Sequence, residues 1–156
     1  RAEIDNDKAV FEAYPLGDKA LKALALDAEN IPDLVPLIAI LACFTDGKSK
    51  ITGIKRLRLK ESDRLLATEE LIDGLGGSFK IHEDAIEISG LGAGAMLRGG
   101  KVRCFDDHRI VMSAATSSLR CKEDVLIDNA FAVNKSYLGF FDELDRLGLS
   151  SKCIWK

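Results

Sequence analysis

The sequence has no long apolar segment, no signal-peptide pattern and no excess of positive charge. Its longest apolar run, residues 34–44, is too short to span a bilayer, and its start lacks the basic, apolar and small-residue regions of a secretory signal. The 22 Lys and Arg residues against 25 Asp and Glu residues give a net charge of −3, which argues against nucleic-acid binding as the main role. We therefore expect no membrane and no nucleic acid as partner.

Cysteine is sparse and carries no metal signature. The four cysteines form no CxxC pair and have no histidine at metal-ligand spacing, and they are Cys43, Cys104, Cys121 and Cys153. We expect four reduced thiols, a cytoplasmic location and no structural zinc. The glycines of residues 90–100 match no phosphate-loop or dinucleotide fingerprint, so we expect them to form a flexible connection.

The composition, with 47% apolar and 30% charged residues over 156 positions, fits a globular domain or one lobe of a larger protein. Residues 34–44 are apolar nearly all round, which predicts a helix buried on every side after an N-cap at Asp33. Alternating apolar and basic residues predict a strand over 50–59. The other expected elements are strands at 9–14, 78–81, 85–89, 101–105 and 124–128, a turn and strand within 19–27, and helices at 61–75, 108–119 and 135–147.

The order of these elements repeats along the chain. Asp33 with its helix, strand and second helix corresponds to Asp107 with the same series of elements. We expect an α/β protein in which residues 1–156 form a single partial domain, with an internal repeat of about 33–90 and 101–150. Because the first helix of each unit is apolar, sheets should wrap around buried helices.

Charged residues gather at the expected helix starts. Free N–H groups and the helix dipole suit these ends to phosphate and carboxylate, and an arginine fork grips two oxygens at once. Four cations that meet there are unfavourable without an anion to bind. The pattern predicts an anion-binding site with acid and base groups. The residues concerned are Asp33, Lys60, Glu61, Arg64, Asp107, His108, Arg109, Asn134 and Lys135.

Each of these residues also has a purely structural interpretation. Glu61 and Asp63 fit ordinary first-turn acids, with Arg64 as their exposed salt-bridge partner. Asp33 and Asp107 fit simple N-caps. Only the gathering of the residues favours a site over these interpretations. His108 fits an ordinary histidine at a helix start, and Lys135 fits a solvated lysine.

Four short motifs follow one another within residues 27–148. They are Ile31-Pro32-Asp33, Lys60-Glu61-Ser62-Asp63-Arg64, Asp107-His108-Arg109-Ile110-Val111-Met112 and Asn134-Lys135-Ser136. In this order they closely resemble the 5-enolpyruvylshikimate-3-phosphate synthase family. The resemblance implies two lobes of repeated β-α-β-α-β-β units, each an inside-out α/β barrel with buried helices and outer sheets.

The resemblance also implies a reaction. The enolpyruvyl group of phosphoenolpyruvate is transferred to the 5-hydroxyl of shikimate-3-phosphate, phosphate is released, and neither a metal nor an organic cofactor takes part. By position, Arg64, Arg109 and Lys135 look like the clamp for phosphoenolpyruvate. Lys60 looks like a ligand of shikimate-3-phosphate.

The resemblance also implies which residues transfer protons. Asp33 would hold the shikimate hydroxyls and take the proton of the attacking one. Glu61 would act as acid and base at carbon, with Lys135 assisting, and His108 would border the reacting centre.

Length is where the chain departs from the family. It resembles only the latter part of the C-terminal lobe and opens with Arg1 rather than Met, so we expect a fragment or a processed chain. The N-terminal lobe is then an expected partner, and the chain alone is expected to be inactive. Arg56 stands where some family members have an asparagine near the substrate, which puts that contact in doubt.

Three other functions compete with this one. A sister enolpyruvyl transferase acts on UDP-N-acetylglucosamine with the same fold and reaction, but the motifs favour the shikimate enzyme. An RNA-terminal phosphate enzyme or translation-factor-like module predicts a basic face, which the net charge opposes. A non-catalytic anion-binding or scaffolding domain predicts that Asp33 and Glu61 point away from Arg64 and Arg109.

Overall fold

Two parallel strand–helix–strand units form the frame of the chain. The structure, a computed structural model, describes residues 2–5, 8–11, 21–60, 62–152 and 154. In each unit the two strands pair in parallel and the helix connects them. The elements are β4 (Ala25–Asp27), α1 (Val35–Ala42) and β6 (Lys48–Thr52), then β9 (Gly100–Val102), α3 (His108–Ser117) and β10 (Val125–Ile127).

The first unit continues into a second helix and a hairpin. α2 (Arg64–Gly74) follows the short 3₁₀ helix η2 (Lys55–Leu59). The antiparallel hairpin of β7 (Ser78–His82) and β8 (Ala85–Ser89) then completes a four-stranded sheet of order β4-β6-β8-β7. The predicted hairpin and the predicted helix before it are confirmed.

Three of the four remaining strands lie near the start of the chain. β1 (Ala2–Asp5) and β2 (Lys8–Phe11) form an antiparallel hairpin, and β3 (Leu21–Lys22) pairs in parallel with β5 (Thr45–Asp46). The strand expected at 9–14 overlaps β2, while residues 12–14 lie outside the described residues. Of the turn and strand expected within 19–27, residues 19 and 20 also lie outside them.

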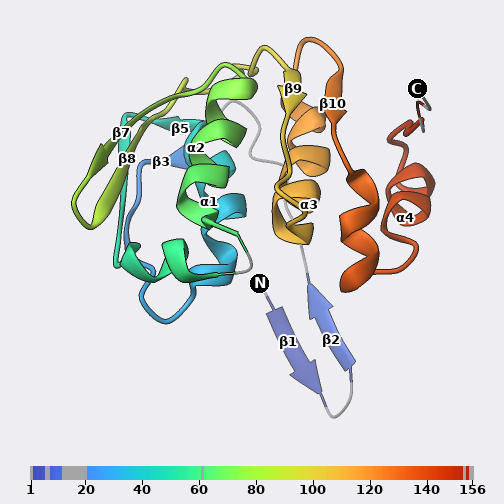
Figure 1. Cartoon of the computed structure of the whole chain (residues 1–156), viewed down its shortest axis with the longest axis horizontal. Coiled ribbons are helices and arrows are strands. Elements are labelled where there is room, and N and C mark those ends of the chain that lie inside the picture. The colour runs from blue at the N-terminus through green and yellow to red at the C-terminus, as the bar shows by residue number, and fades with distance from the viewer. Residues whose placement is uncertain (1, 6–7, 12–20, 61, 153, 155–156) are drawn as a thin grey trace.

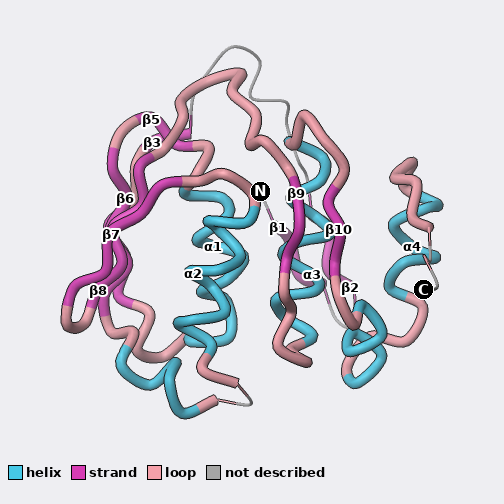
Figure 2. The backbone as a smooth tube through the Cα atoms, turned by 45° about the horizontal axis from the view of Figure 1, so that its top comes forward, coloured by secondary structure: helices cyan, strands magenta, loops and turns pink. Residues whose placement is uncertain are grey.

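Helices α1 and α2 lie between the sheets. The four-stranded sheet stands on one side of α1 and α2, and the β9–β10 pair stands on the other side, against α3 (Figures 1 and 2). The three helices contact one another and bury Ile40, Leu71 and Ile110 between them. Across the part of the chain described, no helix combines the length and the apolar character needed to cross a membrane.

The composition of α1 predicted a helix buried on every side, and this prediction is wrong. The helix buries Val35, Ala39 and Ile40, but Leu37 and Leu41 on the same helix are exposed. Residues four apart share one face of a helix, so the two exposed leucines form an apolar stripe on α1. Composition alone does not distinguish a helix covered all round from one with an uncovered apolar face.

Three predicted element boundaries are wrong. The strand expected over 101–105 ends at Val102, and a glycine stands at each of the other two. The strand expected over 50–59 ends at Thr52, because Gly53 has φ +70° and a left-handed residue does not continue a strand. The helix expected from residue 135 begins only at α4 (Phe140–Arg146), after Gly139 with φ +83°. Residues 130–135 form the 3₁₀ helix η4 (Ala130–Lys135) instead.

The connection between β8 and β9 is tied to its neighbours and ends in a turn that requires glycine. Gly99 has φ +89°, and a Cβ there would lie 2.4 Å from the Glu123 carbonyl oxygen. We expect Gly99→Ala to lower the free energy of unfolding by about 2–4 kcal/mol, from left-handed backbone strain plus overpacking. Gly92 is the matched control, because its φ is +86° and a Cβ there would meet no other atom within 4 Å.

Urea denaturation of both variants measures the difference. Gly92→Ala is expected to lose only the backbone term of about 1–2 kcal/mol. Equal losses for the two variants would contradict the close approach of Gly99 to Glu123.

Candidate functional site

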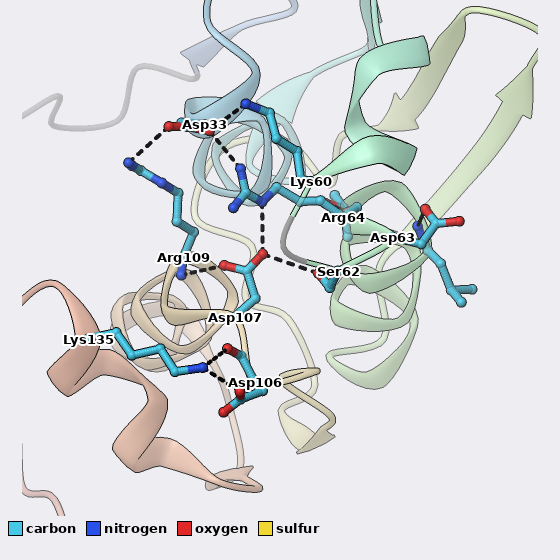
Figure 3. A network of polar contacts seen from close by, with 11 residues as sticks. Asp33, Lys60, Ser62, Asp63, Arg64, Asp106, Asp107, Arg109 and Lys135 are labelled. Atoms are coloured by element: carbon cyan, nitrogen blue, oxygen red, sulfur yellow. Dashed lines mark hydrogen bonds and ion pairs between the residues drawn. The ribbon is translucent and has the colours of Figure 1, made fainter.

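Three helix starts that are far apart in the sequence meet at one end of the helices. η1 (Pro32–Leu34) stands before α1, and the segments before α2 and α3 lie beside it. Figure 3 shows that their polar side chains point toward one another. The side chains brought together are Asp33, Lys60, Ser62, Arg64, Asp107 and Arg109.

Asp33 is the centre of this cluster. Its Oδ1 lies 2.7 Å from Nη1 of Arg64 and 3.4 Å from Nζ of Lys60, and its Oδ2 lies 3.1 Å from Nη2 of Arg109. Burial by itself raises the pKa of the Asp33 carboxyl, but the charge of Arg109, the hydrogen bond and charge of Arg64 and the charge of Lys60 together hold the pKa below its usual range. Asp33 is therefore ionised at neutral pH.

The prediction that Asp33 caps the apolar helix is wrong. Asp33 lies inside η1, and α1 begins after Leu34 without a side-chain cap. The carboxylate is drawn to the cations instead of the free N–H groups of α1. The competing scaffolding interpretation predicted that Asp33 and Glu61 both point away from Arg64 and Arg109. Its prediction for Asp33 is contradicted, and Glu61 lies outside the described residues.

Arg64 and Asp107 form a buried ion pair beneath Asp33. Both side chains are 0% exposed, and Nε of Arg64 donates to Oδ2 of Asp107 at 2.8 Å. Ser62 Oγ lies 3.2 Å from the same oxygen, and Oδ1 accepts from the backbone N–H of Arg109 at 2.9 Å. Asp107 thus caps α3, as predicted, and also joins the segments before α2 and α3. The interpretation of Arg64 as an exposed salt-bridge partner is wrong.

Asp63 faces away from the cluster (Figure 3). Its Oδ1 accepts from the backbone N–H of Leu66 at 3.1 Å and caps α2, and its Oδ2 pairs with Arg58 at 3.0 Å. Asp63 and Arg58 therefore stabilise the start of α2, and we assign them no chemical role.

Lys135 does not stand at a helix start. It is the last residue of η4, because the following helix begins only at Phe140. Its Nζ donates to the main-chain carbonyl of Asp106 at 3.1 Å and forms an ion pair with the Asp106 carboxylate. The hydrogen bond from Lys135 holds the pKa of the Asp106 carboxyl below its usual range. Three of the four expected cations therefore converge on Asp33. The fourth, Lys135, instead binds Asp106, the residue before Asp107.

His108 is the first residue of α3 and half-buried, and no hydrogen bond of its side chain occurs among the described residues. Glu61 lies outside the described residues. Ser62 and Asp106 stand in the two charged stretches that the sequence singles out, but sequence reasoning assigned neither of them a role. It missed Asn129, whose only signal was a residue type that accepts tight turns.

The cluster suits an anion with several oxygens. A phosphate or carboxylate would offer Lys60 and Arg109 the same kind of acceptor that Asp33 offers them now. Within the described ranges, no group of three or more His, Cys, Asp or Glu side chains is arranged to hold a metal ion. A cavity of about 260 Å³ lies elsewhere, between the ends of β4 and β6 and the β7–β8 turn, and Arg56 lines it.

Comparison with known proteins identifies the same family that the motifs resemble. The family model for EPSP synthase (3-phosphoshikimate 1-carboxyvinyltransferase) matches residues 2–144. The 3-phosphoshikimate 1-carboxyvinyltransferase of Clostridium novyi (strain NT) is 41% identical over 125 residues, which cover 80% of this chain and 28% of the relative. That of Methanosarcina acetivorans is 38% identical over 153 residues, which cover 98% of this chain and 34% of the relative. The chain thus spans about a third of the length of these relatives.

Solved structures agree. A 2.37 Å structure of EPSP synthase from Acinetobacter baumannii matches with a TM-score of 0.70 and 32% identity, over 74% of this chain and 27% of that one. The enolpyruvyl transferase NikO from Streptomyces tendae matches with a TM-score of 0.71 over 95% of this chain and 32% of that one, and at 19% identity it is informative for the fold alone. The predicted α/β fold is confirmed.

Proposed function

The chain belongs to the EPSP synthase (3-phosphoshikimate 1-carboxyvinyltransferase) family, and on that premise we propose the reaction of the complete protein. It transfers the enolpyruvyl group of phosphoenolpyruvate to the 5-hydroxyl of shikimate-3-phosphate and releases phosphate. The observation that carries this proposal is the contact of one carboxylate, Asp33, with three cations from two separate motifs. Such a group of cations is suited to hold a substrate with phosphate and carboxylate groups.

Substrate binding in this scheme is an exchange of anions. Arg64, Arg109 and Lys135 take the phosphate and carboxylate of phosphoenolpyruvate, and Lys60 takes an oxygen of shikimate-3-phosphate. Because Arg64 and Arg109 now pair with Asp33, the incoming anion has to replace that carboxylate. Arg64 keeps its buried contact with Asp107 throughout.

Proton transfer follows from the same exchange. A carboxylate paired with three cations is a weak base, since its pKa is held low. When substrate anions take the arginines, Asp33 becomes a stronger base and removes the proton of the 5-hydroxyl. Glu61 protonates the methylene carbon with assistance from Lys135 while the 5-oxygen bonds to the adjacent carbon, which gives a tetrahedral intermediate. Glu61 then removes a methyl proton as phosphate leaves, which restores the double bond. His108 borders the reacting centre. No metal or organic cofactor enters the scheme.

The rest of the enzyme is the proposed partner of this chain. The relatives are about three times longer, and the apolar stripe of Leu37 and Leu41 on α1 is suited to contact further helices of the same lobe. The N-terminal lobe would supply the remaining substrate contacts, and no nucleic acid is involved. Free thiols at Cys43, Cys104 and Cys121 agree with a cytoplasmic location.

Phosphate release by the complete protein tests this function. We expect steady-state release with phosphoenolpyruvate and shikimate-3-phosphate, and none with phosphoenolpyruvate and UDP-N-acetylglucosamine. The chain of 156 residues alone is expected to release no more phosphate than its Glu61→Ala variant. Turnover of the UDP-sugar in place of shikimate-3-phosphate would identify the sister reaction, and turnover of neither would refute the proposal.

A further inference from the structure

Strained backbone is concentrated beside the cation cluster. Among the described residues, three non-glycine residues have positive φ, and they are Phe105 at 55°, Asp106 at 59° and Asn129 at 40°. The first two form the turn from β9 into α3, and Asn129 stands before η4, opposite that turn. The left-handed region is unfavourable for residues other than glycine, although Asp and Asn adopt it more readily than Phe. Strain of this kind persists only where the surrounding contacts hold it.

The contacts that hold this strain lead to Lys135. Asp106 Oδ1 accepts from Nδ2 of Asn129 at 2.9 Å, while its Oδ2 and its main-chain carbonyl both accept from Nζ of Lys135. Two of the left-handed residues, Asp106 and Asn129, therefore bind each other. Asp106 also offers a side-chain and a main-chain oxygen to the ammonium group of Lys135. Figure 3 shows Lys135 directed at Asp106.

The same turn fixes the neighbouring cations. Asp107, the next residue, is the buried partner of Arg64 and caps α3. The turn is closed by a hydrogen bond from the N–H of Asp107 to the carbonyl of Cys104 at 2.9 Å, and Cys104 N–H in turn donates to Oδ1 of Asp128 at 2.6 Å. Adjacent carboxylates on one rigid turn thus hold Arg64 and Lys135.

We propose that Asp106 is a positioning residue that fixes the ammonium group of Lys135 beside the cation cluster, with Asn129 orienting Asp106. This rests on the proposed function, in which Lys135 binds phosphoenolpyruvate and assists proton transfer. η4 ends at Lys135 and leaves the side chain on an exposed segment, so a separate anchor is needed to hold the ammonium group in one place. Asp106 supplies that anchor.

An ordinary surface ion pair is the competing explanation, and the chain contains one for comparison. Lys48 and Glu87 pair at 3.1 Å with side chains 62% and 26% exposed, while those of Lys135 and Asp106 are 53% and 61% exposed. Exposed pairs contribute little by themselves, but the two pairs differ in their contacts. Glu87 offers Lys48 one side-chain oxygen, whereas Asp106 also offers Lys135 its main-chain carbonyl and accepts from Asn129. The three described non-glycine residues with positive φ all lie elsewhere, at 105, 106 and 129, and none adjoins Lys48 or Glu87.

Chemical labelling of lysine amines tests the anchor without any need for activity. An acylating reagent is applied to the chain and to Asp106→Asn and Glu87→Gln, and each modified lysine is quantified by mass spectrometry. Asparagine tolerates the left-handed backbone, but its single acceptor oxygen cannot serve both Lys135 and Asn129 as two carboxylate oxygens do. We expect labelling of Lys135 to become about tenfold faster in Asp106→Asn. Labelling of Lys48 in Glu87→Gln is expected to rise only about twofold.

Kinetics of the complete protein supply the functional readout. Asp106→Asn is expected to raise KM for phosphoenolpyruvate and to lower kcat, each about tenfold, with KM for shikimate-3-phosphate unchanged. Asn129→Gly keeps a left-handed residue but removes the amide, and it should change the same two parameters by a smaller factor. Thermal unfolding checks that both variants fold.

The outcomes separate this inference from the proposed function. Unchanged labelling of Lys135 in Asp106→Asn overturns the positioning role, whether or not the complete protein is active. Faster labelling with wild-type kinetics also overturns it, since the position of Lys135 would then not matter. Absence of transfer activity in the wild-type protein counts against the proposed function alone, and the labelling result still decides whether Asp106 anchors Lys135.

Discussion

Asp107→Ala is expected to lower the free energy of unfolding of the chain by about 3–5 kcal/mol, because it removes one partner of a buried ion pair. Asp107 and Arg64 are both 0% exposed, and the carboxylate also accepts from Ser62 and from the backbone N–H of Arg109. Without it, the buried Nε–H of Arg64 loses the Asp107 carboxylate as acceptor. Urea denaturation followed by circular dichroism measures the loss.

Asp63→Ala is the matched control for this prediction. Asp63 also caps a helix and pairs with an arginine, but its partner Arg58 is exposed. Its removal is expected to destabilise the chain by only about 1 kcal/mol, the usual contribution of an N-cap. Equal losses at the two positions would show that burial of the Arg64–Asp107 pair has no energetic consequence.

A double variant distinguishes lost pairing from lost packing. Arg64→Met by itself leaves Asp107 buried without that cation, whereas Arg64→Met with Asp107→Ala removes both charges. The double variant is therefore expected to be less destabilised than the sum of the single variants, by about 1–3 kcal/mol. Additive losses would contradict a direct interaction.

Asp33→Asn is expected to lower kcat of the complete protein by about 10²–10⁴-fold, the range that general base catalysis contributes. The amide has nearly the shape of the carboxylate but cannot take a proton from the 5-hydroxyl. It also frees Lys60, Arg64 and Arg109 from a competing anion. KM for phosphoenolpyruvate is therefore expected to stay the same or fall while kcat falls.

Steady-state phosphate release with both substrates measures this split between kcat and KM. Asp73→Asn is the matched control, because Asp73 is exposed near the end of α2, away from the helix starts. It should leave both parameters at wild-type values. A kcat for Asp33→Asn within about twofold of wild type would remove Asp33 from the role of general base, since a base contributes far more than that.

Local features were readable from the sequence because short-range interactions determine them. The cap at Asp107 depends on an aspartate side chain that reaches an N–H two residues along the chain. The hairpin of β7 and β8 follows from two short strand-like runs around a turn at residues 82–84. The four motifs were recognisable for the same reason, since each is a short run of neighbouring residues.

Features that depend on distant contacts were not readable. Arg64 looked like a surface cation because its neighbours are charged, yet it is buried against Asp107, which lies 43 positions away. Asp33 looked like a helix cap, yet it binds three cations from two other segments. Local sequence does not show which side chain reaches a carboxylate first when several donors compete for it.

The sequence by itself determined the α/β class, most of the helix and strand order and the charged residues that stand at the helix starts, because period, turns and motifs are local properties. Only the tertiary structure decided how those residues pair. It joined η1, α2 and α3 at one end, buried Arg64 with Asp107, and placed Lys135 on Asp106. The physical reason is that the strength of an ion pair depends on burial and distance, and both arise only when separate segments of the chain pack together.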